Sequence, residues 1–452
     1  GAAPLAAASS APAASDTLAT APALGPAGSA PSAPAALAGG AASPTPAASA
    51  PLPAFLPAPR DSSPARRYSP WRQLVPRYWL PLVAGTDDGR LALGAYTSGS
   101  DVVGRHSYGA QVTAPPGDPG EVDASLGWRY AGLGQPLLDV AVGQFWEHDP
   151  VFVSRGAQEV GTLTHRTREA LVAATFVRPR MRTYASLSVG AGYEMRDYAT
   201  EPAPLIQRLA TFYRSQPRYP SLFASAGWSN ARRPALGISP EDGVSLTASA
   251  RERWRTGAGD AGRGRTMIGV ARGYKSLDLP GYAHHVLALR LAGGAATGTD
   301  DDLELGGTSG SAEELLPGLT IGTGQRTFGV RGFPAAALTG RRAAGGTVEY
   351  RAPLTLPARG LGLFPVFLAR TSLSAFAEGA SAWCPASVAA SCATPDGARR
   401  AIASAGAELD VDAALQYDVP YRFRFGVAAP IAGRSYFGKG SAAAYVTLGL
   451  AF

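Results

Sequence analysis

Few residues in this sequence have the types and the spacing that catalytic or metal chemistry requires. The run Gly433-x-x-x-x-Gly438-Lys439 imitates a phosphate-binding loop, but Gly440 stands where a Ser or Thr must hold the metal ion. His284 and His285 are adjacent in an alternating segment, so they point to opposite faces and cannot share one metal ion. No Gly-x-Ser-x-Gly run occurs. The sequence therefore predicts no enzyme, no catalytic residue, no metal site and no cofactor.

The two cysteines, Cys384 and Cys392, lie within one loop-like run that also contains Pro385 and small residues. Two thiols alone make a poor zinc site, because structural zinc normally takes four ligands. An even, closely spaced pair is typical of a disulfide in an oxidising compartment. We therefore predict a disulfide between Cys384 and Cys392 in an external loop.

A long segment, residues 297–343, contains the run Gly329-Val330-Arg331-Gly332-Phe333. The stretch that follows it, residues 345–354, alternates between apolar and charged side chains, which is typical of a half-buried strand. A segment of this length without structure of its own is rare in a compact domain and is usually functional. We therefore look for the function of the chain in this segment.

The rest of the chain, residues 76–452, repeats alternating segments that turn residues separate. Val244 and Leu246, for example, alternate with Ser245 and Thr247. We count about 16 such segments, an even number like that of bacterial single-chain outer-membrane barrels. A soluble β-sandwich is the alternative, but small residues between aromatic strand ends are unusual there. The sequence predicts an all-β fold, a transmembrane antiparallel β-barrel with outer-membrane lipid outside, a polar lumen inside, and the long segment inserted into that lumen.

The lengths of the connections predict the orientation of the barrel in the bacterial outer membrane. Outer-membrane barrels keep short turns in the periplasm and long loops outside. The loops with Arg331 and with the cysteine pair are therefore expected outside the cell, and both ends of the barrel in the periplasm. The chain ends on a strand whose last outward residue is Phe452, which resembles the C-terminal signal strand of outer-membrane barrels. The predicted short turns are 132–135, 178–181 and 417–420, and the predicted long loops are 148–166, 199–218, 297–343 and 384–400.

Residues 1–75 are predicted to form a disordered linker rich in Ala and Pro, because Pro recurs every few residues and nothing large is available to bury. A tether of this length suggests an attached upstream partner. The net charge of +7 comes without a basic block or an aromatic-basic motif, so we expect no nucleic acid partner.

Three sequence motifs resemble those of the BamA/TamA-type outer-membrane insertase and two-partner-secretion transporter superfamily, also called the bacterial surface antigen family. Val330-Arg331-Gly332-Phe333 resembles its loop motif, and residues 303–307 resemble the lead-in that ends in two glycines. The strand 376–383 resembles Phe-x-Asp-x-Gly-x-x-Trp, with Glu378 in place of Asp and Ala380 in place of Gly. The resemblance implies that Arg331 of the loop bonds Glu378 inside the lumen, and the alternation of the strand places Glu378 on the inward face.

Insertases of this superfamily carry periplasmic POTRA domains, and residues 1–75 cannot form one. Members that follow a periplasmic β-propeller fit the Ala/Pro-rich linker better. The resemblance implies a barrel that assists insertion or translocation of protein or lipid, with a client polypeptide or a periplasmic domain as partner. The alternative function is a structural anchor or passive pore that holds a periplasmic or surface partner.

Overall fold

The computed structural model describes residues 68–85, 90–153, 158–199, 218–256, 262–298, 302–307, 313–316, 319–321, 327–334, 337–385, 399–415, 419–437 and 440–450. Cys392, Phe452 and residues 1–67 of the predicted linker lie outside these ranges. Within them, no helix is long and apolar enough to cross a membrane.

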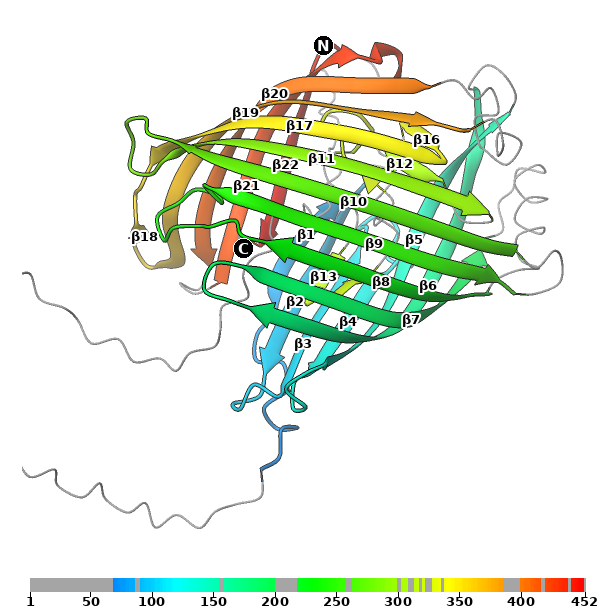
Figure 1. Ribbon diagram of the computed structural model, residues 1–452, viewed down its shortest axis with the longest axis horizontal. Coiled ribbons are helices and arrows are strands. Elements are labelled where there is room, and N and C mark those ends of the chain that lie inside the picture. The colour runs from blue at the N-terminus through cyan, green and yellow to red at the C-terminus, as the bar shows by residue number, and fades with distance from the viewer. Residues whose placement is uncertain are drawn as a thin grey trace, which may run out of the picture.

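Most of the described chain forms one curved antiparallel sheet in which wall strands that follow each other in sequence lie side by side (Figure 1). The sheet has 17 strands, of which β18 (Arg359–Leu361) is a short addition at the end of β19. The other strands make the wall of a transmembrane β-barrel, which confirms the predicted fold class. They are β1 (Leu80–Gly85), β2 (Leu91–Ser100), β3 (His106–Ala114), β4 (Asp123–Tyr130), β5 (Leu137–Val153), β6 (Gln158–Pro179), β7 (Tyr184–Tyr198), β8 (Arg218–Ser229), β9 (Gly243–Arg255), β10 (Gly262–Leu277), β11 (His285–Gly298), β17 (Arg342–Thr355), β19 (Phe364–Trp383), β20 (Arg400–Leu415), β21 (Val419–Ala432) and β22 (Ala443–Leu450).

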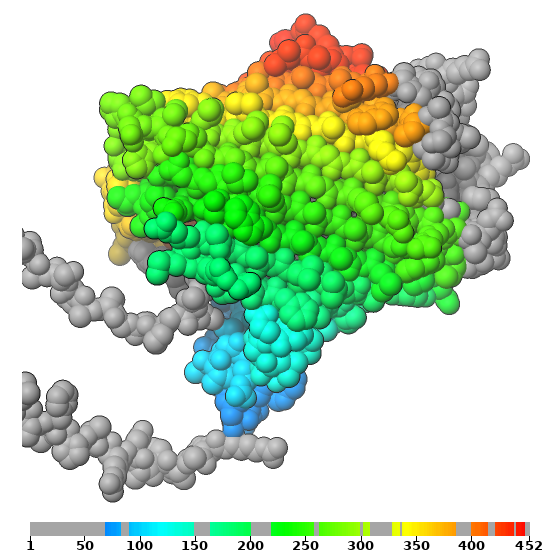
Figure 2. All heavy atoms as spheres, in the orientation of Figure 1, coloured from blue at the N-terminus to red at the C-terminus, as the bar shows by residue number. Residues whose placement is uncertain are grey.

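The faces of the strands follow the predicted alternation. On β9, Val244 and Leu246 are exposed on the outside, whereas Ser245 is buried on the inside. On β21, Phe425 and Val427 are exposed on the outside in the same way. The outer face forms a continuous wall over β8–β11 (Figure 2). A sheet that is apolar outside and polar inside is suited to lipid on the outside.

One predicted long loop, 148–166, is wrong. β5 continues to Val153 and β6 begins at Gln158, and the two strands stay in register over nearly their whole length. At the base of this extension the Thr167 hydroxyl of β6 donates to Glu147 of β5 at 2.7 Å, and the ring of His165 stacks on Tyr198 of β7. An extended hairpin does not need an apolar face to keep its backbone ladder, which is why alternation alone missed it.

The barrel has two ends, named here by their connections. The turn end carries the connections β2–β3, β4–β5, β6–β7, β8–β9, β10–β11, β17–β19 and β20–β21, and the loop end carries those between β7 and β8, β11 and β17, and β19 and β20. Before β1, residues 71–75 form a turn near the β2–β3 connection, where the side chain of Gln73 accepts a bond from the backbone N–H of Val102 at 2.8 Å. The described chain therefore begins at the turn end.

The first and last strands, β1 and β22, lie beside each other and close the wall. Every other pair of neighbouring wall strands shares a backbone ladder, but among the described residues none joins β1 to β22. β1 is also the shortest wall strand, with six residues, and it contains Pro81, which has no N–H to donate. This join is the seam of the barrel.

Candidate functional site

The segment between β11 and β17 folds into the lumen and has structure of its own, so the expectation of an unstructured loop is wrong. Three short strands form a small sheet: β12 (Leu303–Leu305), β15 (Thr327–Phe328) and β16 (Leu338–Gly340). A hairpin of β13 (Glu313–Leu316) and β14 (Leu319–Ile321) reaches across to β3, β4 and β5. The inserted segment therefore spans the lumen from one wall to another.

Apolar side chains fasten the inserted segment to the inner wall. The buried residues of the segment include Leu303, Leu305, Phe328, Val330 and Phe333. They pack against small or apolar wall residues and against one loop aromatic, namely Ala292, Ala343, Ala380, Ile402 and Phe437. Removing this apolar surface from water stabilises the docked position by roughly 25 cal/mol per Å². Small inward residues on the wall leave the room that the segment occupies.

The two glycines of the lead-in join it directly to the arginine motif. The Gly306 N–H donates to the Phe328 carbonyl at 3.0 Å, and the Gly307 N–H donates to the Phe333 carbonyl at 3.0 Å. Gly306 has φ +120°, and a Cβ there would lie 2.1 Å from the carbonyl oxygen of Pro334. Only glycine fits this position, which explains why the lead-in ends as it does.

Arg331 lies on the inner wall, where its guanidinium contacts three carboxylates. Its Nε donates to Glu378 Oε2 at 3.1 Å and its Nη1 to Glu408 Oε2 at 2.8 Å. Its Nη2 donates to Glu349 Oε1 at 2.6 Å, and its backbone N–H bonds the other oxygen of Glu378. The structure thus brings Arg331 and Glu378 together, as the resemblance implies, and adds two further acids.

The surroundings of this cluster hold every member in place. Cζ of Arg331 lies 3.6 Å from the centroid of the Phe376 ring, a cation–π contact. The Tyr445 hydroxyl donates to Glu408 at 2.7 Å, and Nε of Arg351 donates to Glu349 at 2.9 Å. A planar guanidinium with five donors suits several carboxylates at once, whereas a lysine would not. The arrangement clamps the segment to β17, β19 and β20.

Sequence reasoning missed Glu349 and Glu408 as partners of Arg331. Both lie on inward faces, and their strands β17 and β20 flank β19, which carries Glu378. The signal was therefore present, because inward acids on three adjacent strands form one patch. The alternating pattern does not determine the position of each acid along the barrel axis, because that position depends on the register between strands.

The other site residues are distributed as follows. Val330 and Phe333 of the loop motif are buried, and the Phe333 ring meets Phe437 edge-on at 5.1 Å. Cys384 is buried just after β19, while Cys392 and Phe452 lie outside the described residues. In the described part of the chain, no three His, Cys, Asp or Glu residues are grouped as metal ligands. Asp302, in an acidic run before β12, pairs with Arg341 at 2.8 Å.

We expect Cys384 and Cys392 to be bonded to each other. Non-reducing mass spectrometry should find one peptide pair that is joined until a reductant is added. The bond closes a short loop, so we expect its loss to cost on the order of 2–3 kcal/mol at most. Two free thiols in the protein purified from an oxidising compartment would contradict this prediction.

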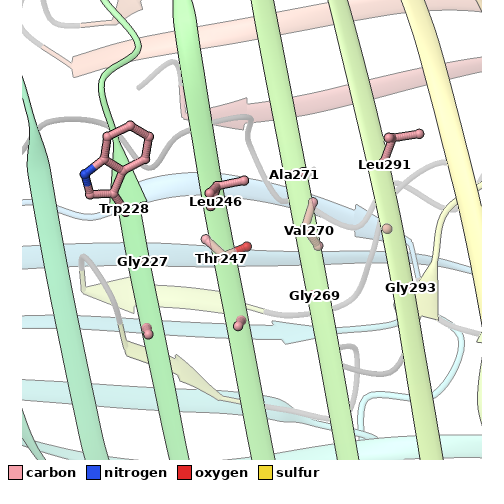
Figure 3. Close-up of a pocket in the computed structure, with 12 residues that line it drawn as sticks. Gly227, Trp228, Leu246, Thr247, Gly269, Val270, Ala271, Leu291 and Gly293 are labelled. Atoms are coloured by element: carbon pink, nitrogen blue, oxygen red, sulfur yellow. The ribbon is translucent and has the colours of Figure 1, made fainter.

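A hollow of about 530 Å³ lies on the outer wall, away from Arg331. Its floor consists of small outward residues on four adjacent strands, and its rim is made by Trp228, Leu246 and Leu291 (Figure 3). The small floor residues are Ala226, Ala248, Gly269, Ala271 and Gly293. This hollow faces the lipid side and contains no charged group, so it offers no chemistry.

Comparisons with known proteins find structural likeness only. No protein-family model matches the chain, and no curated protein is similar in sequence. A structure of BamA from Haemophilus ducreyi lacking POTRA domains 1–3 aligns with 78% of this chain at 15% identity and a TM-score of 0.47, and the alignment covers 66% of that structure's own length. OprD from Pseudomonas aeruginosa aligns with 79% of this chain and 88% of its own at 10% identity and a TM-score of 0.29.

Proposed function

We propose that the protein is an outer-membrane barrel that assists the insertion or translocation of polypeptide or lipid by opening sideways between β1 and β22. The observation that supports this function is the seam, where no backbone ladder is found among the described residues. Each unsatisfied backbone group in lipid costs several kcal/mol, so a seam without a ladder is the wall's weakest join. A client strand could satisfy those groups by pairing with the open edge.

The filled lumen supports a sideways route over a passive pore. The inserted segment spans the lumen from β19 and β20 to β3–β5, and Arg331 clamps it there. A second segment folds inward from the turn end, between β8 and β9, and reaches β19 and β21. A pore that conducts steadily would need an open lumen. A structural anchor for a periplasmic or surface domain is the remaining alternative, and the seam would then have no use.

The partner of the proposed function is a client polypeptide, which a periplasmic domain or a separate protein would deliver. The lipid of the outer membrane surrounds the wall. The inner face offers the client a polar surface, whereas the seam offers unpaired backbone groups at an edge of the sheet.

Locking the seam tests the proposal. Pairs of cysteines are placed along β1 and β22 in a protein whose Cys384 and Cys392 are changed to serine. We expect a disulfide between the two strands to stop the activity. The measurement is the rate at which proteoliposomes containing the protein insert a urea-unfolded eight-stranded barrel. The rate should fall about tenfold or more in the locked form and recover when the bridge is reduced, because the edge is no longer available.

The matched control is a bridge across a join that already has a ladder. Ala95 and Val112 face each other across β2 and β3, so Ala95→Cys with Val112→Cys adds a bond without closing an edge. That variant should insert the substrate at the unlocked rate. If the disulfide between β1 and β22 leaves the insertion rate and the pore conductance unchanged, as the control disulfide should, lateral opening is not the mechanism. The anchor function should then replace it.

A further inference from the structure

The hollow on the outer wall has a floor of small residues that runs straight across four strands. Ala226 of β8 pairs with Ala248 of β9. Ala248 pairs in turn with Gly269 of β10, and Gly269 pairs with Gly293 of β11. Large outward side chains close the floor on the side of the turn end, namely Trp228, Leu246 and Leu291 (Figure 3). On the side of the loop end, the next outward residues of β8, β9 and β11 are small, namely Ala224, Ala250 and Ala295.

Charged residues of β10 mark the two limits of the apolar outer band beside the hollow. Arg265 and Lys275 both lie on the outward face, and the outward residues between them, from Met267 to Gly273, are uncharged. The ten residues from Arg265 to Lys275 rise about 33 Å along the strand, or roughly 25 Å along the barrel axis for a tilt of about 40°. The apolar band of outer-membrane barrels is about 25 Å tall. Arg265 therefore lies at the level of the lipid head groups at the loop end.

A second outward arginine lies at nearly the same level on the other side of β11. Arg265 is four residues from Gly269 along β10. Arg342 begins β17 and is two residues from Ala344, which pairs with Gly293. With strands about 4.8 Å apart and a rise of about 3.3 Å per residue, the Cα atoms of Arg265 and Arg342 are roughly 12 Å apart. Long arginine side chains extend from an apolar wall toward the head groups, so both guanidiniums can reach one phosphate group there.

The contacts of these two arginines leave them suited to a further anionic partner. Nη2 of Arg265 donates to Glu252 at 3.1 Å, and Glu252 also pairs with Arg263, so two arginines share one carboxylate. Nη1 of Arg342 donates to two backbone carbonyls, each at 3.2 Å. On the outward face of the loop-end halves of β8–β11 and β17, the described charged residues are Arg218, Arg263, Arg265, Arg342 and Glu252. An anionic head group complements this set.

We propose that a phosphorylated lipid of the surrounding leaflet binds here, with its phosphate group between Arg265 and Arg342 and an acyl chain in the hollow. Guanidinium groups bind phosphate through parallel N–H donors, and such charge-assisted bonds are about twice as strong as neutral ones. The hollow, about 530 Å³, has the size of a small-molecule site. Lipid tails are apolar everywhere in the bilayer, so the arginines supply the selectivity and the small floor residues supply the close fit.

Native mass spectrometry of the full chain in an uncharged detergent, with dimyristoyl phosphatidic acid as the probe, tests the arginines. We expect a saturable adduct whose affinity falls about tenfold or more in Arg265→Gln with Arg342→Gln, because two charged donors are lost. The matched control is Arg166→Gln with Arg168→Gln. These arginines lie on the outward face of β6 at the same end, and they share Asp197 as an acid partner. The control should keep the wild-type affinity.

A second pair of variants tests the hollow without changing a charge. Gly269→Leu fills the floor, and the atom nearest to its Cβ would be the Thr247 carbonyl oxygen at 3.9 Å, an ordinary contact. We expect this variant to weaken the binding of phosphatidic acid about tenfold or more, because the acyl chain loses its place. Gly273→Leu is the matched control on the same face of β10, outside the hollow, where an added Cβ meets nothing within 4 Å. Its affinity should stay as in the wild type.

Dimyristoyl glycerol, which has the same chains without the phosphate, should form no saturable adduct. Heat-modifiable migration on a gel checks that all variants are folded. The site does not exist if the wild-type chain binds phosphatidic acid without saturation, or if either test variant binds it as its control does. Equal affinity for dimyristoyl glycerol would also overturn the proposal, since the arginines would then recognise nothing. None of the variants changes β1 or β22, so these outcomes leave the proposed function to its own test.

Discussion

Arg331→Ala should release the inserted segment from the lumen wall. The change removes the guanidinium that contacts Glu349, Glu378 and Glu408 together, and these carboxylates are at most 12% exposed. Removing one partner of a buried ion pair typically costs about 3–5 kcal/mol, because the remaining charge is buried without compensation. We therefore expect protease to cleave the segment in the folded barrel, and the conductance in planar bilayers to rise.

Two further variants separate the clamp from a general loss of charge. Glu378→Gln should have a smaller effect than Arg331→Ala, since Arg331 keeps Glu349 and Glu408 as partners. Arg434→Ala is the matched control, because Arg434 is an exposed arginine in the neighbouring 3-10 turn, Arg434–Tyr436, and its loss should change neither measurement. Unchanged protease resistance and conductance in Arg331→Ala would mean that the clamp does not hold the segment.

The alternation of apolar and polar residues predicted the wall strands because each side chain of a wall strand faces either the outside or the lumen. Val244 and Ser245 differ in polarity, and the sheet places one outside and the other inside. The same rule located Glu378 on the inward face. Such a local pattern needs no knowledge of the rest of the chain.

Residues that are joined across the lumen could not be found in this way. The connection between β8 and β9, residues 230–242, looks like an ordinary connection in sequence. Arg370 and Arg422, which contact it, come from strands far along the chain. The extension of β5 and β6 was missed for a related reason, since their backbone ladder continues where the apolar pattern stops. Both features depend on tertiary pairing, which local propensity does not determine.

Gly332→Val should prevent the motif from docking even though it leaves every charge in place. Gly332 has φ +86°, a conformation that β-branched residues rarely adopt. A Cβ there would lie 2.9 Å from Cβ of Ala428 and 2.9 Å from Cε2 of Phe437, so the wall and the loop would have to move apart. Backbone strain and overpacking each cost about 1–3 kcal/mol, and here they act together next to the Arg331 clamp.

We expect Gly332→Val to make the inserted segment sensitive to protease and to raise the conductance, as Arg331→Ala does, while the barrel still migrates as a folded species on a gel. The matched control is Gly273→Ala on β10, where an added Cβ meets nothing within 4 Å, so protease resistance should stay as in the wild type. Combining Gly332→Val with Arg331→Ala should add little to either change alone, because both break the same docked state. A double variant with fully additive effects would show that the glycine and the arginine hold the segment independently, and the motif would then not act as one clamp.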